Sequence, residues 1–174
     1  MAACADEEIV ADPPSGTRQG RRGFVLIVTC ISLTLLLAVA GLGIDIGRMY
    51  VIRTELQSFT DAAALSAALE LNGASDSIAR ARTGASRLAT GPHAMRWDMG
   101  TQPISNIATS FSSDQATWQE QPKQTGAYHF VRVVATAPAP VIFLRVFQPL
   151  GLSTSTVAAA SVAAKTEQSV RLIQ

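Results

Sequence analysis

IDIGRMYVIRTELQSFTDAAALSAALEL, residues 44–71, has the repeat of an amphipathic helix. Apolar or small side chains recur every three or four residues, which is the spacing of one face of an α-helix. The stripe consists of Met49, Ile52, Leu56, Phe59, Ala63 and Ser66, with Ala62, Leu65 and Leu69 beside it. The other side is polar and carries Arg53, Glu55, Gln57 and Asp61. The stretch predicts a helix that ends before Asn72-Gly73 and needs a cover on one side.

The helical pattern continues upstream into FVLIVTCISLTLLLAVAGLGI, residues 24–44, which carries no charge. As a helix this run is roughly 31 Å long, close to the ~30 Å hydrocarbon core of a bilayer. We therefore expect one continuous helix over about residues 24–71, with a transmembrane anchor at residues 21–47. Arginines are more frequent before the run than after it, which favours a cytoplasmic N-terminus. Residues 1–20 are expected to form a disordered cytoplasmic tail.

A cleaved signal peptide is the alternative interpretation of the same segment. A basic region, an apolar region and the small residues Ala38-Val39-Ala40 fit a cleavage site after Ala40. Cleavage there would release a secreted binding module. The apolar run continues past Ala40 through Leu42, Ile44 and Ile46, however, and the helical pattern crosses the site. This observation favours an uncut anchor, and both interpretations remain open.

Asp45 is the first charged residue after the apolar run. In one interpretation it lies at the membrane interface and pairs with Arg48; in the other it contacts a neighbouring subunit or sets the depth of the helix. Gly43 and Gly47 have the G-x-x-x-G spacing that lets two membrane helices approach closely. The candidates for anchoring and helix packing are Gly43, Asp45, Gly47, Arg48, Leu56 and Asp61.

The N-terminal segment resembles TadG-like proteins of the tight-adherence (Flp) pilus system and, more loosely, their TadE-like relatives. The resemblance rests on Arg21-Arg22-Gly23, on Gly41-Leu-Gly-Ile-Asp45 with Arg48 and Tyr50, and on Leu56-Gln57 followed by Asp61-Ala-Ala-Ala-Leu-Ser66. It implies a non-catalytic, single-pass protein of the bacterial inner membrane whose C-terminal domain is periplasmic or extracellular. The implied partners are membrane lipid, other pilus-assembly proteins and a second copy bound through the long helix.

Two features depart from the patterns of related proteins. Prepilin-type cleavage after Gly23 would require Glu at the fifth following position, but that residue is Val28. A D-x-S-x-S motif, found in relatives with a von Willebrand A-type domain, does not occur in the sequence. The resemblance therefore implies a short form, with an anchor and one small domain at residues 48–174.

The remaining sequence predicts an α+β fold in which the long helix packs on a small antiparallel sheet, as in pilin-like domains. A second helix is expected at residues 75–90, capped by Ser75 or Asp76, and a loop at residues 92–103. Strands are expected at residues 104–113, 128–137 and 152–165, the second ending at Pro138 and the last having a helical alternative. Residues 141–147 are expected to form a short helix.

Little in the sequence points to catalysis. His93 and His129 are isolated, and the carboxylates Asp98, Asp114 and Glu120 form no recognisable acid–base pair. The net charge of +1 gives no basic field for nucleic acid, Cys4 and Cys30 form no disulfide framework, and we expect no cofactor or metal. Trp97 and Trp118 are expected to pack the domain. Phe143 and Phe147 are either core residues or a surface for membrane or partner.

Overall fold

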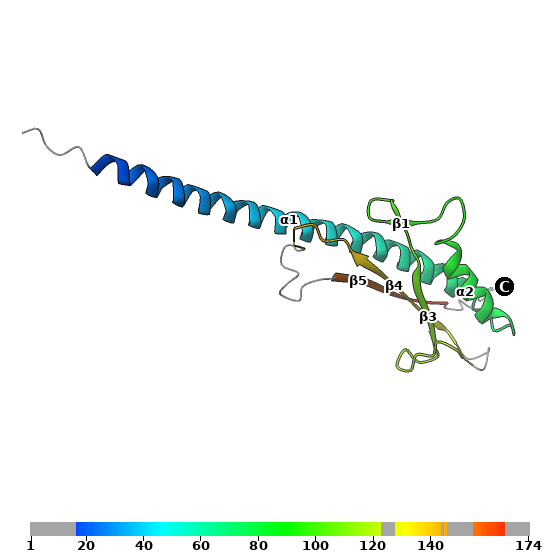
Figure 1. Ribbon diagram of the computed structural model, residues 1–174. Helices are drawn as coiled ribbons and strands as arrows, with labels where there is room; N and C mark the ends of the chain where they lie inside the picture. Colours follow the sequence, from blue (N-terminus) through cyan, green and yellow to red (C-terminus); the bar gives the residue numbers. More distant parts are fainter. Residues whose placement is uncertain (1–16, 123–127, 144, 146–154, 166–174) are drawn as a thin grey trace, which may run out of the picture. The chain divides into compact units, whose positions relative to one another are not determined.

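The computed structural model describes residues 17–122, 128–143, 145 and 155–165, with side chains described from residue 23 onward. It separates into two compact units, residues 1–40 and residues 41–174. Helix α1, Thr17–Leu69, begins in the first unit and continues as the first element of the second (Figure 1). The helix begins seven residues earlier and ends two residues earlier than predicted. The prediction for residues 1–16 lies outside the described residues.

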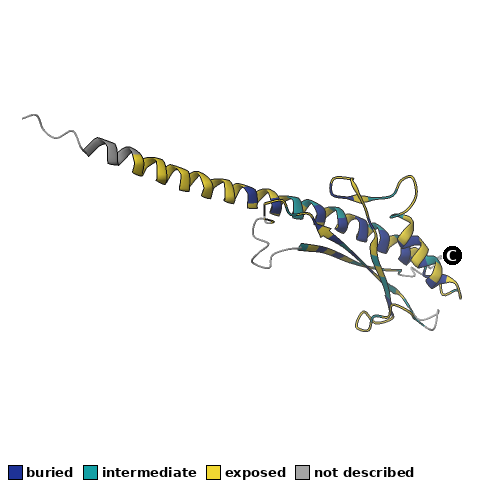
Figure 2. Ribbon diagram, in the orientation of Figure 1, coloured by how far each residue is buried: buried dark blue, intermediate teal, exposed yellow. Residues whose placement is uncertain are grey.

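The first unit is helical over residues 17–40, and its helix is apolar from Phe24 onward. Its large apolar side chains from Phe24 to Val39 are exposed by 44% to 69% (Figure 2). The hydroxyls of Thr29 and Thr34 donate to the carbonyls four residues earlier, so these polar groups are satisfied within the helix. Among the described residues, one helix, from Gly23 onward, has the length and composition needed to cross a membrane.

In the second unit, α1 buries the predicted stripe. Ile52, Leu56, Phe59 and Ala63 are fully buried and lie at the centre of the core. Leu65 and Leu69, which were expected beside the stripe, are instead exposed. Each residue adds about 100° of rotation, so Leu65 lies roughly half a turn away from Ala63 and points away from the core.

The stripe is covered by an antiparallel sheet of three strands in the order β3-β4-β5. Their bounds are Asn106–Ser112, Phe130–Ala139 and Ser155–Ala164. Alternate residues of the central strand β4 are buried: Val131, Val133, Ala135, Ala137 and Ala139. The predicted α+β architecture is confirmed, including the strand character of the Ala-rich β5. The likeness to pilin domains stays a prediction.

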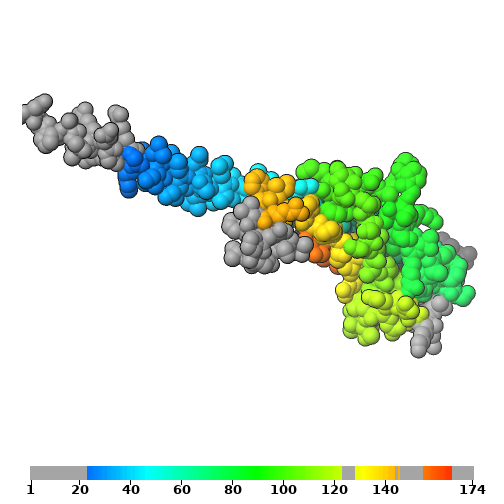
Figure 3. Space-filling model, in the orientation of Figure 1, coloured from blue at the N-terminus to red at the C-terminus, as the bar shows by residue number. Residues whose placement is uncertain are grey.

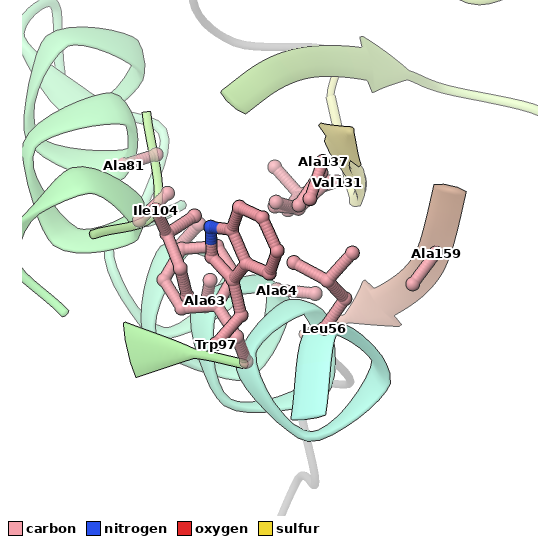
Figure 4. Close-up of a cluster of buried hydrophobic side chains, with 14 of the residues drawn as sticks. Leu56, Ala63, Ala64, Ala81, Trp97, Ile104, Val131, Ala137 and Ala159 are labelled. Carbon is pink, nitrogen blue, oxygen red and sulfur yellow. The ribbon is translucent and has the colours of Figure 1, made fainter. Parts of the chain in front are cut away.

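Two smaller elements close the core. Helix α2, Ser77–Arg87, buries Ile78, Ala81 and Ala85. Strands β1, Arg96–Trp97, and β2, Gln102–Pro103, form a short hairpin where a loop was predicted. The hairpin places the indole of Trp97 among core residues of α1, as Figure 4 shows, and its Nε1–H donates to the Pro103 carbonyl at 3.0 Å. The predicted packing role of Trp97 is confirmed.

Pro138 does not end the second predicted strand, because β4 continues to Ala139. Phe111 of β3 exchanges backbone hydrogen bonds with Gln119, so its N–H and C=O point away from β4. The even-numbered residues of β3 therefore form the hydrogen bonds to β4, and the β4 residues opposite them are also even-numbered. The pairing between β3 and β4 stops at Thr136. Pro138 is the next even-numbered residue of β4 and has no β3 residue opposite it. Its missing N–H therefore interrupts no hydrogen bond between the two strands.

Two further local predictions differ from the structure. Ile142 and Phe143 form a bend and not a helix, Arg145 lies in a 3₁₀ turn, and residues 144, 146 and 147 of the predicted short helix lie outside the described residues. Asp76 occupies the N-cap position of α2 but makes no side-chain cap bond, and its carboxylate pairs with Arg80 instead.

Truncating Phe59 to alanine removes one of the two largest fully buried side chains among the described residues, the other being Phe111. We expect Phe59→Ala to lower the free energy of unfolding of the domain by roughly 3–5 kcal/mol, because a large cavity forms beneath the sheet. The matched control Leu65→Ala, on the exposed side of the same helix, should cost less than about 0.5 kcal/mol. Urea unfolding of the full chain in detergent measures both values, and equal losses would contradict this assignment of the two helix faces.

Candidate functional site

The candidate site is the stretch Gly41–Arg48, where the apolar run of α1 ends, together with the two segments that contact it. One segment is residues 140–143, directly after β4. The other is the turn of the β1–β2 hairpin, residues 98–101. We call this arrangement the exit region, and every residue in it belongs to the second unit.

Asp45 is buried, with 1% of its surface exposed. One carboxylate oxygen, Oδ1, accepts the backbone N–H of Ile142 at 3.0 Å, and the other, Oδ2, accepts that of Phe143 at 2.9 Å. Hydrogen bonds from two N–H groups offset the cost of removing a carboxylate from water. They also fix the segment after β4 against the helix, and the orange atoms of this segment lie beside the helix in Figure 3.

This geometry corrects the expectation that Asp45 is exposed and that Arg48 is its hydrogen-bond partner. The side chain does not reach headgroup water, and the hydrogen bonds of Arg48 go to another carboxylate. Its contact with residues 142 and 143 lies within the chain and nearly one hundred positions away.

Gly41 and Phe143 pack in the same place. A Cβ atom on Gly41 would lie 2.5 Å from the Phe143 ring, so only glycine lets the ring approach the helix this closely. Phe143 still keeps 42% of its surface exposed, and Ile142 keeps 56%. Phe143 therefore contacts the helix with one side and leaves the other open. Phe147 lies outside the described residues.

Arg48 forms a bidentate ion pair with Asp98. Its Nε donates to Oδ1 at 2.9 Å and its Nη2 to Oδ2 at 2.8 Å. These hydrogen bonds lower the pKa of Asp98 below its usual range, although burial of the carboxyl acts in the opposite direction. The partner of Arg48 was missed from the sequence because Asp98 is 50 residues away in a segment predicted to be a loop.

The turn that holds Asp98 has an unusual backbone. Asp98 and Met99 both have φ of 57°, and Gly100 has φ of 78°. The left-handed region is costly for a side chain such as that of Met99. Glu55, two turns beyond Arg48 on α1, accepts the backbone N–H of Met99 at 3.0 Å. Arg48 and Glu55 thus hold the first two residues of a strained turn against the helix.

The remaining candidates divide into two kinds. Leu56 is core, and Asp61 bonds to Gln57 and to Ser161 of β5, so both contribute to packing within the domain. Gly43 and Gly47 are exposed, and no atom lies within 4 Å of a Cβ built on either. Their predicted role in packing against another helix stays a prediction.

The arrangement offers geometry for binding but little for catalysis. Within the described part of the chain, no group of three or more His, Cys, Asp or Glu residues is placed to hold a metal ion. Asp98 is held by Arg48, Asp114 by the backbone of its own turn, and Glu120 is exposed. Asp98 and Asp114 therefore contribute to the structure of their turns.

The fold and the exit region define a class: a protein whose apolar N-terminal helix continues as the core helix of a small α+β domain. Residues 23–70 match the family model Tad, described as "Putative Flp pilus-assembly TadE/G-like". The resemblance predicted from the N-terminal segment is confirmed for this segment, which ends where α1 ends. No curated protein and no solved structure gave a match to the chain.

Replacing Asp45 by asparagine tests the contact with residues 142 and 143. An amide can accept only one of the two N–H bonds and presents an NH₂ group to the other, so we expect a local loss of roughly 1–3 kcal/mol. Hydrogen exchange should quicken at Ile142 and Phe143 while the β4–β5 ladder stays protected. Asp61→Asn serves as the control, because Asp61 bonds to Gln57 and Ser161 and not to residues 142 and 143. Equal exchange at residues 142 and 143 in both variants would contradict the role given to Asp45.

The ion pair between Arg48 and Asp98 predicts a pH dependence. Because the folded state lowers the pKa of Asp98, the stabilisation is present above the unfolded value and is lost as pH falls through the folded value. Asp98→Asn keeps the shape and tolerates a positive φ. We expect wild type to be more stable than this variant near neutral pH and the difference to shrink below about pH 4. Urea unfolding at several pH values measures it, and a difference independent of pH would contradict the prediction.

Proposed function

We propose that the chain is a non-catalytic, single-pass membrane component of a Flp/Tad-type pilus-assembly machine. Its N-terminus lies in the cytoplasm, residues 21–47 cross the inner membrane, and the domain of residues 48–174 is exported. The protein acts by packing its helix and by binding other proteins of the machine. The observation that carries the proposal is that the TadE/G-like match spans both the exposed apolar run and the buried stripe of α1.

The physical support comes from the continuity of α1. The run from Phe24 to Val39 exposes apolar side chains all round the helix, which water does not favour and lipid does. Cleavage after Ala40 would place Gly41 and Asp45 in the first turn of a new helix, where backbone groups fray. The contacts that Gly41 and Asp45 make with Phe143 are better supported by a helix that continues upstream.

The exposed side of α1 is the proposed surface for neighbouring helices. Gly43, Gly47, Tyr50, Leu65 and Leu69 all lie opposite the buried stripe and are exposed. The two glycines allow close approach near the membrane, and the two leucines offer apolar surface at the far end of the helix. This side accommodates another protein of the machine or a second copy of the chain.

The alternative is a secreted binding module released after Ala40. It keeps the whole second unit and loses the first. The two functions differ in the mature N-terminus and in the association with membranes, so one set of measurements separates them.

Full-length protein expressed in bacteria should keep the residues before Gly41, resist carbonate extraction and show a fixed orientation. Two proteins with one cysteine each report the orientation, and Cys30 is replaced by serine in both. One retains Cys4 in the N-terminal segment. The other carries Ser58→Cys on the exposed side of α1, with Cys4 also replaced by serine. We expect an impermeant maleimide to label residue 58 in intact spheroplasts and Cys4 only after lysis. A mature chain that begins at Gly41 and stays soluble would establish the secreted module instead.

A further inference from the structure

The segment after β4, residues 140–143, exposes two apolar side chains although its backbone is fixed against α1. Asp45 holds its backbone by the N–H groups of Ile142 and Phe143, so the segment cannot move freely from α1. The Phe143 ring rests on Gly41, yet both apolar side chains keep about half of their surface exposed. A domain in water gains nothing by fixing two such side chains in contact with solvent.

The neighbouring part of α1 is exposed and apolar as well. Leu42, Ile44 and Ile46, which flank Asp45, have 41%, 57% and 55% of their surface exposed. Together with Ile142 and Phe143 they form an apolar belt within the second unit. The first charged pair along the helix, Arg48 with Asp98, follows directly after the belt.

The position of the belt identifies what covers it. Residues 42–46 continue, without a polar break before Asp45, the run that begins at Phe24. A helix that enters the hydrocarbon at Phe24 leaves it after roughly 30 Å, which is close to Ile44. The belt is therefore level with the boundary between acyl chains and headgroups, where an apolar side chain on one helix and an ion pair one turn further are both favoured.

We infer that Ile142 and Phe143 insert into the membrane leaflet that faces the domain, so that the domain contacts lipid at a second point beside its own helix. The inference rests on the uncut anchor of the proposed function. Asp45 acts as the positioning residue, because its carboxylate fixes the depth of residues 142 and 143 relative to the helix exit. Two contacts with one leaflet restrict the rotation and tilt of α1, which a single helix alone does not restrict.

The experiment uses the full chain in phosphatidylcholine vesicles with an environment-sensitive fluorophore on one cysteine, Cys4 and Cys30 being replaced by serine. Ile142→Cys is the test site, since its side chain is exposed and the Phe143–Gly41 contact stays intact. Phe143→Cys repeats the test at the second residue. Leu65→Cys is the matched control: an exposed leucine on α1, twenty positions beyond Asp45. Ser32→Cys, inside the apolar run, reports insertion of the anchor itself.

We expect a spin label on the upper part of the lipid acyl chain to quench residues 142 and 143 at least about threefold more strongly than residue 65, and iodide to show the reverse order. Asp45→Asn should reduce the lipid quenching at residue 142. If residue 32 is quenched by lipid but residues 142 and 143 behave like residue 65, the inference is wrong and the anchor stands. If residue 32 is not quenched, the proposed function itself fails.

A protein that covers the apolar belt in place of lipid would give different quenching results. A second copy covering the belt would shield residue 142 from iodide without lipid quenching, in a manner that depends on the protein-to-lipid ratio, and this would overturn the inference. Shielding that persists in dilute detergent, with cross-links from residue 142 to other residues of the same chain, would assign the belt to the chain itself and would also overturn it.

Discussion

Helix α1 has an exposed apolar half and a half that carries the buried core of the domain. The structure depends on the few residues between these two halves. Upstream of Gly41 the exposed surface of α1 is apolar, whereas downstream of Arg48 the helix buries one stripe and presents polar groups elsewhere. Among the described residues, the sheet has no other large element to bury its inner residues against, because α2 contributes three buried apolar side chains. The described core of the domain therefore depends on the second half of α1.

Asp45 shows how the change of environment is managed. A leucine at this position would extend the apolar run and leave the N–H groups of residues 142 and 143 without an acceptor on the helix. The carboxylate supplies that acceptor twice, at the cost of desolvating a charge. What this arrangement contributes is registry: the end of β4 is tied to one turn of α1, and Arg48 and Glu55 tie the hairpin turn to the next turns.

The elements that periodicity determines could be predicted from the sequence. The stripe of Ile52, Leu56 and Phe59 follows from helical spacing, and the Val- and Thr-rich β4 follows from strand propensity. The partners of Asp45 and Arg48 could not be predicted, because they lie 97 and 50 residues away and depend on how β4 and the hairpin return to the helix. The spacing of three between Asp45 and Arg48 is a local signal, whereas the hydrogen-bond partners of both side chains lie in segments whose return to the helix the sequence does not indicate.

The extent of the family match bears on where the function lies. The match stops at Glu70, one residue after α1 ends, so it includes the outer side of the helix and the stripe that the sheet covers but not the sheet itself. A protein that works through helix packing needs only what the matched segment contains: an apolar run, two glycines at its end and an outer face left open by its own domain. Within the domain, the sheet covers one face of α1 and leaves the opposite face of the helix exposed.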